Sequence, residues 1–254
     1  PISSDSALNA FETFYGQRAL ADYDFSKSKI VVSIGANFLE DWQGGGYESG
    51  YAKSRIPLKK NKKAIMSKHF QFESNMSLTG ANADYRLPCT PSDQKNILAY
   101  IYDNLILGLP GQLSEKLKPL ADKAIDELKN FGSEGVIVTG IEDENAQAAV
   151  FAINTFLNSK SFDPQSPKLI RQGNTKEVLA LFKEIEKGDL DGLITVEVNP
   201  VFTYPDGGAL SEAIKNLEFS LNFTSTINET SSVSQFVAAV PHYLESWGDY
   251  EFKP

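Results

Sequence analysis

The stretch that decides the fold is Lys29-Ile30-Val31-Val32-Ser33-Ile34, closed by Gly35-Ala36-Asn37. A short apolar run that ends in small and turn residues is typical of a strand buried inside a parallel sheet. Comparable runs follow along the chain at residues 68–72, 135–138, 193–198, 217–223 and 236–240, although the first of these alternates with polar residues. These runs predict a series of strands that each end in a turn.

Segments with helical spacing of apolar residues lie between these runs. Thr90-Pro91-Ser92-Asp93 supplies an N-cap hydroxyl, a proline at the first helical position and a carboxylate near the third. Helices are also predicted to begin at Ser114, after the acidic residues 142–144 and at Asn174. Strands that alternate with such helices predict an α/β fold of wound, mainly parallel sheets with helices on both faces, Rossmann-like and built from two related halves.

Residues 107–113 are rich in Gly and Pro and predict the boundary between the halves. We therefore expect a first α/β unit at residues 1–110 and a second at residues 111–254. Residues 159–167 are predicted to form an exposed loop, and the basic run Lys59, Lys60, Lys62 and Lys63 a solvated one.

Composition excludes several classes of function. The net charge of −9 argues against a nucleic-acid surface, and no apolar stretch is long enough to cross a bilayer. One cysteine and two histidines cannot supply an iron–sulfur cluster and leave a zinc site dependent on carboxylates. Because the chain begins at Pro1, we expect a processed chain or an excerpt whose targeting signal would lie outside it.

The turns after the strands are where an open α/β sheet binds ligands. Gly35-Ala36-Asn37 lacks the G-x-G-x-x-G spacing of a dinucleotide site, and the run Gly44-Gly45-Gly46 favours a flexible loop over a phosphate cradle. His242 and Glu245 could form a proton-transfer pair, but a histidine held by hydrogen bonds near a helix start is favoured. No nucleophilic elbow is present, so nucleophilic catalysis has no support. Because the chain is poor in Cys and His, no catalytic or metal-ligating residue is predicted and the isolated chain is not expected to be catalytic.

Several segments, taken in order, resemble the molybdopterin oxidoreductase family. Residues 23–37 are similar to its strand followed by G-x-N, and residues 79–91 to its T-x-x-x-A-D passage with a proline turn and a helix. The tail follows the family order of an N-P turn at Asn199-Pro200, an E-T pair at Glu229-Thr230 and a final passage at residues 240–248. Residues 41–47 and 72–80 look closest to the iron–sulfur subunit of alternative complex III, a bacterial quinol-oxidising respiratory complex.

This resemblance implies a scaffold module that has lost its pterin cofactor. It implies iron–sulfur clusters elsewhere in the full-length protein, none in this chain, and partners that are the other subunits of a membrane-bound electron-transfer complex. It also implies a peripheral location on the periplasmic side of the bacterial inner membrane, without direct membrane insertion.

Two alternatives stay open. In the first, the chain is an excerpt of an active molybdenum oxidoreductase in which Asn37, Glu73, Asn199 and Glu245 bind the guanosine and phosphate end of molybdopterin. The family's Asp-Pro-Arg turn appears as Glu73-Ser74-Asn75, which keeps the acid and loses the arginine. In the second, the chain is a free-standing protein that binds a nucleotide-like ligand at the same strand ends.

Overall fold

The computed structural model describes residues 4–60 and 63–248, which form two compact units. The first unit extends to Gly173 and the second begins at Asn174. The sequence-based division after residue 110 falls inside the first unit, between α4 (Pro91–Tyr102) and α5 (Lys118–Phe131). The reason is that β7 (Gly135–Thr139), which follows α5, pairs with a central strand of the first unit.

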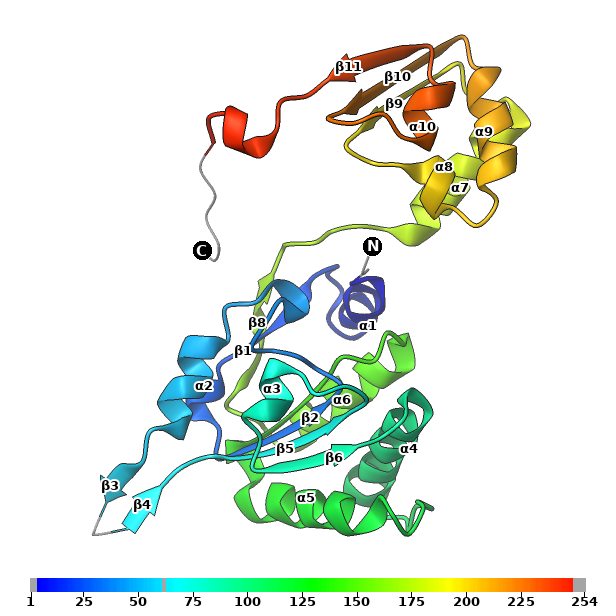
Figure 1. Ribbon diagram of the computed structural model, residues 1–254. Helices are drawn as coiled ribbons and strands as arrows, with labels where there is room; N and C mark the ends of the chain where they lie inside the picture. Colours follow the sequence, from blue (N-terminus) through cyan, green and yellow to red (C-terminus); the bar gives the residue numbers. More distant parts are fainter. Residues whose placement is uncertain (1–3, 61–62, 249–254) are drawn as a thin grey trace. The chain divides into compact units, whose positions relative to one another are not determined.

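The first unit is built on a four-stranded parallel sheet in the order β6-β5-β2-β7 (Figure 1). Its other strands are β2 (Ile30–Ile34), β5 (Lys68–Glu73) and β6 (Tyr85–Pro88). The chain passes from β2 to β5 and β6 on one side, then crosses to β7 on the other. All five side chains of β2 are buried, as the apolar run predicted.

Helices cover both faces of this sheet. On one face α4 and α5 pack on the apolar side chains of β2 and β5. On the other lie α1 (Asp5–Tyr15) and α2 (Glu48–Arg55), and α6 (Glu144–Phe156) contributes side chains to both clusters. This arrangement confirms the predicted wound α/β fold for the first unit.

The helix starts follow the capping residues that the sequence offers. The Thr90 hydroxyl accepts from the Asp93 backbone N–H while the Asp93 carboxylate accepts from that of Thr90, so α4 begins with a complete capping box. Asp143 caps α6, and Asn174 caps α7 (Thr175–Lys187). Helix α5 begins later than predicted, at Lys118, because residues 115–117 form a turn.

Two further parts of the first unit differ from the predictions. The expected loop at residues 159–167 is wrong, because β8 (Phe162–Lys168) pairs antiparallel with β1 (Leu20–Tyr23). The basic run is also not a simple loop: β3 (Leu58–Lys60) and β4 (Lys63–Ile65) pair antiparallel, and Lys62 lies outside the described residues. The glycine run begins at the last residue of a short 3₁₀ turn, η2 (Trp42–Gly44), and continues as a loop.

The remaining short elements of the unit are η1 (Phe25–Lys27), α3 (Leu78–Ala81), η3 (Asp103–Leu107) and η4 (Gly132–Glu134).

The second unit holds a three-stranded parallel sheet in the order β11-β10-β9. After α7 its elements are β9 (Gly192–Val196), α8 (Pro200–Thr203), α9 (Gly207–Lys215), β10 (Phe219–Thr224), α10 (Glu229–Val233), β11 (Phe236–Ala239) and η5 (Tyr243–Glu245). Both units thus contain three parallel strands side by side in chain order, β2-β5-β6 in the first and β9-β10-β11 in the second, as expected for two related halves.

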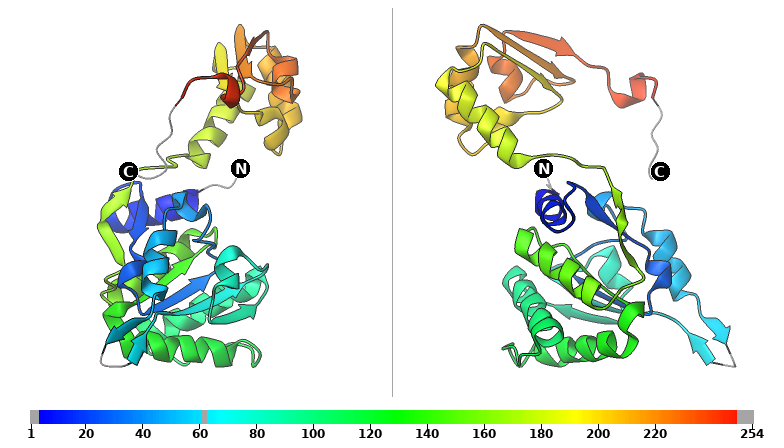
Figure 2. Two further views of the ribbon diagram at one scale, coloured as in Figure 1. Left: turned by 60° about the vertical axis from the view of Figure 1, so that its left-hand side comes forward. Right: turned by 180° about the vertical axis from the view of Figure 1, so that it is seen from behind.

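The helices of the second unit gather on one face of its sheet (Figures 1 and 2). Leu193 lies on that face and packs with Ile185 of α7 and with Leu210 and Ile214 of α9. The opposite face carries apolar side chains that no described helix of the unit covers. We call it the open face, and it consists of Ile194, Val196, Phe219, Leu221, Phe223 and Phe236. The prediction of helices on both faces therefore holds for the first unit alone.

Within residues 4–60 and 63–248, no helix combines the length and apolar character that a bilayer span requires.

Candidate functional site

The loops after β2 and β5 are joined by a hydrogen-bonded clamp at the carboxyl edge of the first sheet. Asn37 Oδ1 accepts from the backbone N–H of Thr79 at 3.3 Å and from its hydroxyl at 2.8 Å. The Thr79 hydroxyl oxygen in turn accepts from the Leu39 N–H at 2.9 Å. Asn37 Nδ2 donates to Glu40, so the side-chain amide is engaged at both ends.

The second unit repeats this clamp after β9 and β10. Asn199 Oδ1 accepts from the Thr230 N–H at 3.1 Å and from the Thr230 hydroxyl at 2.8 Å. The Thr230 hydroxyl oxygen accepts from the Val201 N–H at 3.1 Å, and Asn199 Nδ2 donates to Glu229. Each asparagine therefore holds two loops together with its own amide.

Removing either clamp should destabilise the unit that contains it. Asn37→Ala and Asn199→Ala each leave a threonine N–H and hydroxyl without their acceptor, which should cost about 2 kcal/mol. Amide hydrogen exchange should show faster opening of the β2 amides in Asn37→Ala and of the β9 amides in Asn199→Ala. Asn145→Ala, at an exposed position of α6, should change neither. Equal protection in all variants would show that the clamps add no stability.

Glu73, at the end of β5, is a buried carboxylate with four donors around it. It is 4% exposed and accepts from the Ser77 hydroxyl and N–H, from Gln71 Nε2 and from Arg86 Nε. Burial acts to raise the pKa of Glu73, but the hydrogen bonds from Ser77 and Arg86 outweigh it and hold the pKa below its usual value. A Cβ at Gly80 would lie 1.8 Å from the carboxylate, so any other residue at this position would displace Glu73.

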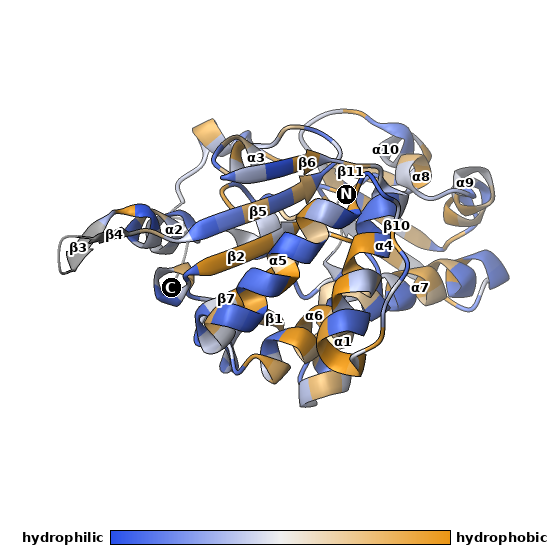
Figure 3. Cartoon of the chain, turned by 90° about the horizontal axis from the view of Figure 1, so that it is seen from below, coloured by the Kyte–Doolittle hydropathy of each residue, from blue (hydrophilic) through white to orange (hydrophobic). Residues whose placement is uncertain are grey.

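A line of buried polar side chains runs along β5 toward Glu73, and Figure 3 shows this strand as partly hydrophilic beside the apolar β2. His69 lies 3.0 Å from the Tyr51 hydroxyl through Nδ1 and 3.2 Å from Gln71 Oε1 through Nε2. Gln71 continues the line to Glu73. Burial lowers the pKa of His69 to about 4, so the imidazole is neutral and can donate from Nε2 while accepting at Nδ1.

The switch point between β2 and β7 is filled by the chain itself. This is the position where a wound sheet commonly holds a ligand. A Cβ at Gly140 would lie 2.2 Å from the Gly35 carbonyl oxygen, so the two loops touch through their backbones. Gln94 of α4 reaches the same edge and donates to Ser74, and the Trp42 indole donates to the Thr139 carbonyl. The Gln94 amide and the Trp42 indole, which could otherwise donate to a ligand at this edge, therefore donate to other residues of the chain.

Glu245 lies in the second unit and is exposed. Its carboxylate accepts from the His242 N–H at 3.2 Å, and His242 Nδ1 accepts from the Leu244 N–H at 3.3 Å. The two residues cap η5, which confirms the prediction of a histidine held by hydrogen bonds at a helix start.

The four residues predicted to bind a cofactor are divided between the two units. Asn37 and Glu73 belong to the first unit, Asn199 and Glu245 to the second. Sequence reasoning missed the partners that occupy them, which are Thr79, Ser77, Arg86 and Thr230. The signal was present, because each asparagine follows a strand and each threonine lies two residues after a capping Ser or Asn. A cofactor role for the four residues stays a prediction.

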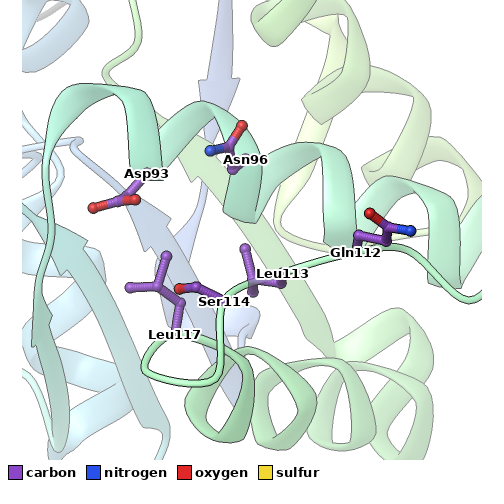
Figure 4. Close-up of a pocket in the computed structure, with 6 residues that line it drawn as sticks. All are labelled: Asp93, Asn96, Gln112, Leu113, Ser114 and Leu117. Atoms are coloured by element: carbon purple, nitrogen blue, oxygen red, sulfur yellow. The ribbon is translucent and has the colours of Figure 1, made fainter.

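Two hollows lie away from these strand ends. One has a volume of about 290 Å³ and lies between α4 and the segment that leads into α5, lined by Asp93, Asn96, Gln112, Leu113, Ser114 and Leu117 (Figure 4). The other, of about 260 Å³, lies in the second unit between the end of α7 and α9. The first is lined by one charged side chain, Asp93, and the second by four, which are Glu186, Lys187, Asp191 and Glu218.

Across the described part of the chain, no group of three or more His, Cys, Asp or Glu side chains could hold a metal ion. Cys89 is buried, and burial raises the pKa of its thiol to about 11. A thiol with that pKa is almost entirely protonated near neutral pH and is a weak nucleophile.

Comparison with known proteins gives one finding on the fold. No family model and no curated protein matches the chain. The formyltransferase/hydrolase complex FhcABCD from Methylorubrum extorquens, solved in complex with methylofuran, contains a chain of similar structure. The TM-score is 0.54 over 93% of this chain and 70% of that chain. Because the sequence identity is 13%, the likeness is one of fold.

The resemblance to the molybdopterin oxidoreductase family, including the iron–sulfur subunit of alternative complex III, is therefore wrong. No family model supports it, and the structure of similar fold comes from a formyltransferase/hydrolase complex. Several of the residues that matched the family pattern belong to the two clamps, namely Asn37, Thr79, Asn199 and Thr230. In this chain they form hydrogen bonds that join neighbouring loops. The periplasmic location and the iron–sulfur clusters elsewhere were inferred from that resemblance and stay untested.

Proposed function

We propose that this chain is an architectural subunit of a protein assembly and that it binds a partner protein through the open face. The open face is the observation that carries this proposal. Parallel sheets occur almost only with both faces covered, because their strands are apolar on both sides. In the second unit Ile194, Val196 and Phe236 are each more than half exposed.

The apolar area of the open face limits the free energy that covering it can supply to binding. Covering a half-exposed Ile, Val or Phe side chain contributes about 1 kcal/mol. The four most exposed of these side chains, Ile194, Val196, Phe219 and Phe236, together contribute on the order of 4 kcal/mol, which only matches the lower estimates of the cost of association. A stable partner must therefore contact the rim of the sheet as well as its apolar centre.

The solved structure with a similar fold supports an assembly role. Its chain belongs to a complex whose designation, FhcABCD, names several components. The supporting point is that this fold occurs in a protein that works within a complex. Formyl transfer or hydrolysis is not proposed for this chain, because 13% identity carries no activity across.

A tagged chain expressed in its native host tests the proposal. The wild-type chain should be recovered in a particle larger than its own 28.0 kDa when measured by mass photometry. The double variant Ile194→Asp, Phe236→Asp places two carboxylates on the open face and should be recovered alone. Ile227→Asp, at an exposed loop position outside the open face, should behave as the wild type.

Far-UV circular dichroism of each variant should match the wild type, because the substituted side chains are already exposed. Recovery of the wild-type chain as a 28.0 kDa monomer would refute an assembly role. Retention of the full particle by the double variant would show that the open face is not the docking surface.

A further inference from the structure

The loop between β2 and α2 holds an unfavourable backbone conformation. We call residues 41–47 the glycine loop. Gln43 and the three glycines after it all have positive φ angles, of 46°, 88°, 69° and 83°. Gln43 is 7% exposed, and its Oε1 atom accepts no hydrogen bond from the residues that the structure describes. A left-handed glutamine and a buried unpaired acceptor both cost free energy, so the surroundings must hold this loop in place.

Trp42 fastens the glycine loop to the carboxyl end of β7. Its indole Nε1 donates to the Thr139 carbonyl oxygen at 3.0 Å, and Thr139 is the last residue of β7. Its ring lies 5.5 Å from the Tyr23 ring and 5.4 Å from the Tyr47 ring, measured between centroids. The position of Trp42 therefore reports whether the loop is closed on the sheet.

A segment that is distant in the sequence also holds the glycine loop. We call residues 168–173 the strap, which begins at the last residue of β8 and leads to α7 (Figure 1). Lys168 Nζ donates to the Gly45 carbonyl oxygen at 3.2 Å and lies 3.8 Å from the centre of the Tyr47 ring. The same ammonium pairs with Asp22 at 3.3 Å, and the lysine side chain is 12% exposed. A lysine so enclosed contributes both its charge and its packing to the contact.

Ile170 and Arg171 of the strap add two more contacts to the loop. A Cβ at Gly44 would lie 2.2 Å from Ile170 Cδ1, so the isoleucine packs directly against the glycine backbone. The Arg171 guanidinium pairs with the Asp41 carboxylate. Arg171 itself has a φ angle of 55°, a left-handed conformation that an arginine adopts at a cost. Both segments are strained where they touch, so each depends on the other.

The end of the strap is tied to α1. Arg18 Nη2 donates to the Gly173 carbonyl oxygen at 2.7 Å and pairs with Asp5 at 2.9 Å. Gly173 is the last residue of the first unit, and the second unit begins at Asn174. The strap is therefore the path by which the chain leaves the first unit, and the contacts named above all lie within that unit.

We infer that the strap is a latch for the glycine loop, so that Trp42 is released from β7 when the strap is released from the first unit. The coupling is reciprocal, because the contacts that hold the loop against the strap also hold the strap against the loop. A partner that draws the strap away therefore opens the carboxyl end of β7. This inference adds a conformational response to the proposed function and does not depend on the open face.

Limited trypsin digestion of the intact chain tests whether the loop holds the strap. Cleavage after Arg171 requires the strap to open, and its rate follows the open population. Gly44→Ala places a methyl group on Ile170, so this cleavage should become about fivefold faster. Gly108→Ala is the matched control, because Gly108 also has a positive φ angle, of 65°, but the added carbon would face open space. This control should be cleaved after Arg171 at the wild-type rate.

The fluorescence of Trp42 tests the coupling in the reverse direction. Trp247→Phe leaves Trp42 as the single tryptophan of the chain. In that background we combine Ile170→Ser with Arg171→Ser and call the result the strap variant. Acrylamide quenching of Trp42 should be about twofold stronger in the strap variant, because the released indole is more accessible.

The control for the strap variant carries Leu169→Ser and Gln172→Ser in the same background. Both residues are exposed and lie in the same strap, so quenching of Trp42 should not change. Unchanged quenching in the strap variant would overturn the inference. Equal cleavage rates after Arg171 in the two glycine variants would overturn it as well.

Cleavage after Arg86 separates release of the strap from global unfolding. Arg86 lies in β6, so cleavage there requires the first sheet to unfold. If Gly44→Ala is also cleaved faster after Arg86, Asp41→Ser replaces it, because Asp41 is exposed and its loss removes the pair with Arg171. Asp41→Ser should then speed cleavage after Arg171 about twofold and leave cleavage after Arg86 unchanged. An unchanged rate after Arg171 would refute the latch.

Discussion

Replacing Glu73 with alanine is expected to lower the free energy of unfolding of the first unit by about 4 kcal/mol. The substitution removes the carboxylate that pairs with Arg86 and leaves that guanidinium, which is largely buried, without a counter-ion. It also leaves the Ser77 hydroxyl without its acceptor, and leaves the Gln71 amide with the Ala36 carbonyl at 3.4 Å alone. Urea denaturation followed by circular dichroism at pH 7 measures the loss.

Two further variants identify the cause. Glu73→Gln keeps the shape and one acceptor oxygen, so it should cost about 2 kcal/mol, less than Glu73→Ala. Glu73→Leu combined with Arg86→Met removes both charges, and it should be less destabilising than Arg86→Met alone, which leaves an unpaired buried carboxylate. Equal losses for Glu73→Gln and Glu73→Ala would show that packing, not charge, sets the effect.

The main strands could be predicted because each is an apolar run closed by turn residues. This pattern located β2, β7 and β9 to within two residues at each end, because a buried parallel strand is a nearly continuous run of apolar residues. Strand β8 was missed because it contains Pro164 and Pro167, which normally argue against a strand. Strand β8 pairs with β1 alone, so only about half of its backbone N–H and C=O groups take part in hydrogen bonds to another strand. Proline, which lacks an N–H, is tolerated at the positions that do not pair.

The open face could not be predicted from the sequence. Ile194 and Val196 read the same as Val32 and Ile34, because an apolar run does not reveal whether one or both faces of a strand are covered. The boundary at Gly173 was missed for a related reason. The segment after residue 110 looks like the start of a new unit, and only its long-range pairing of β7 with β2 assigns it to the first.

The sequence predicted which residues lie at the candidate site but not which residues they contact. Asn37 and Asn199 were found because functional residues in wound sheets follow the strands. What they contact was not, since Thr79 lies 42 residues from Asn37 and Thr230 lies 31 from Asn199. An asparagine amide can bind a cofactor or a neighbouring loop, and the three-dimensional structure shows that each asparagine contacts a loop.

Mild acid is expected to destabilise the first unit through His69. Burial lowers the pKa of His69 to about 4, whereas the unfolded chain has an ordinary histidine pKa near 6.5. Between these values the unfolded state binds more protons, so stability is fully present above pH 6.5 and is lost as the pH falls toward 4. The loss from this group should reach about 3 kcal/mol.

Urea denaturation at pH 7, 5.5 and 4.5 measures this loss, and His69→Gln is the comparison, since glutamine can hydrogen-bond but does not titrate. The variant should start less stable at pH 7 and lose less between pH 7 and 4.5. The carboxylates of Glu73 and Asp84, whose pKa values are both lowered, release their stabilisation mainly at lower pH and do not produce this slope. Parallel stability curves for the two proteins would mean that His69 is protonated in the folded chain. A protonated imidazole would then link Tyr51 and Gln71 by donating from both nitrogens, to the Tyr51 hydroxyl oxygen and to Gln71 Oε1.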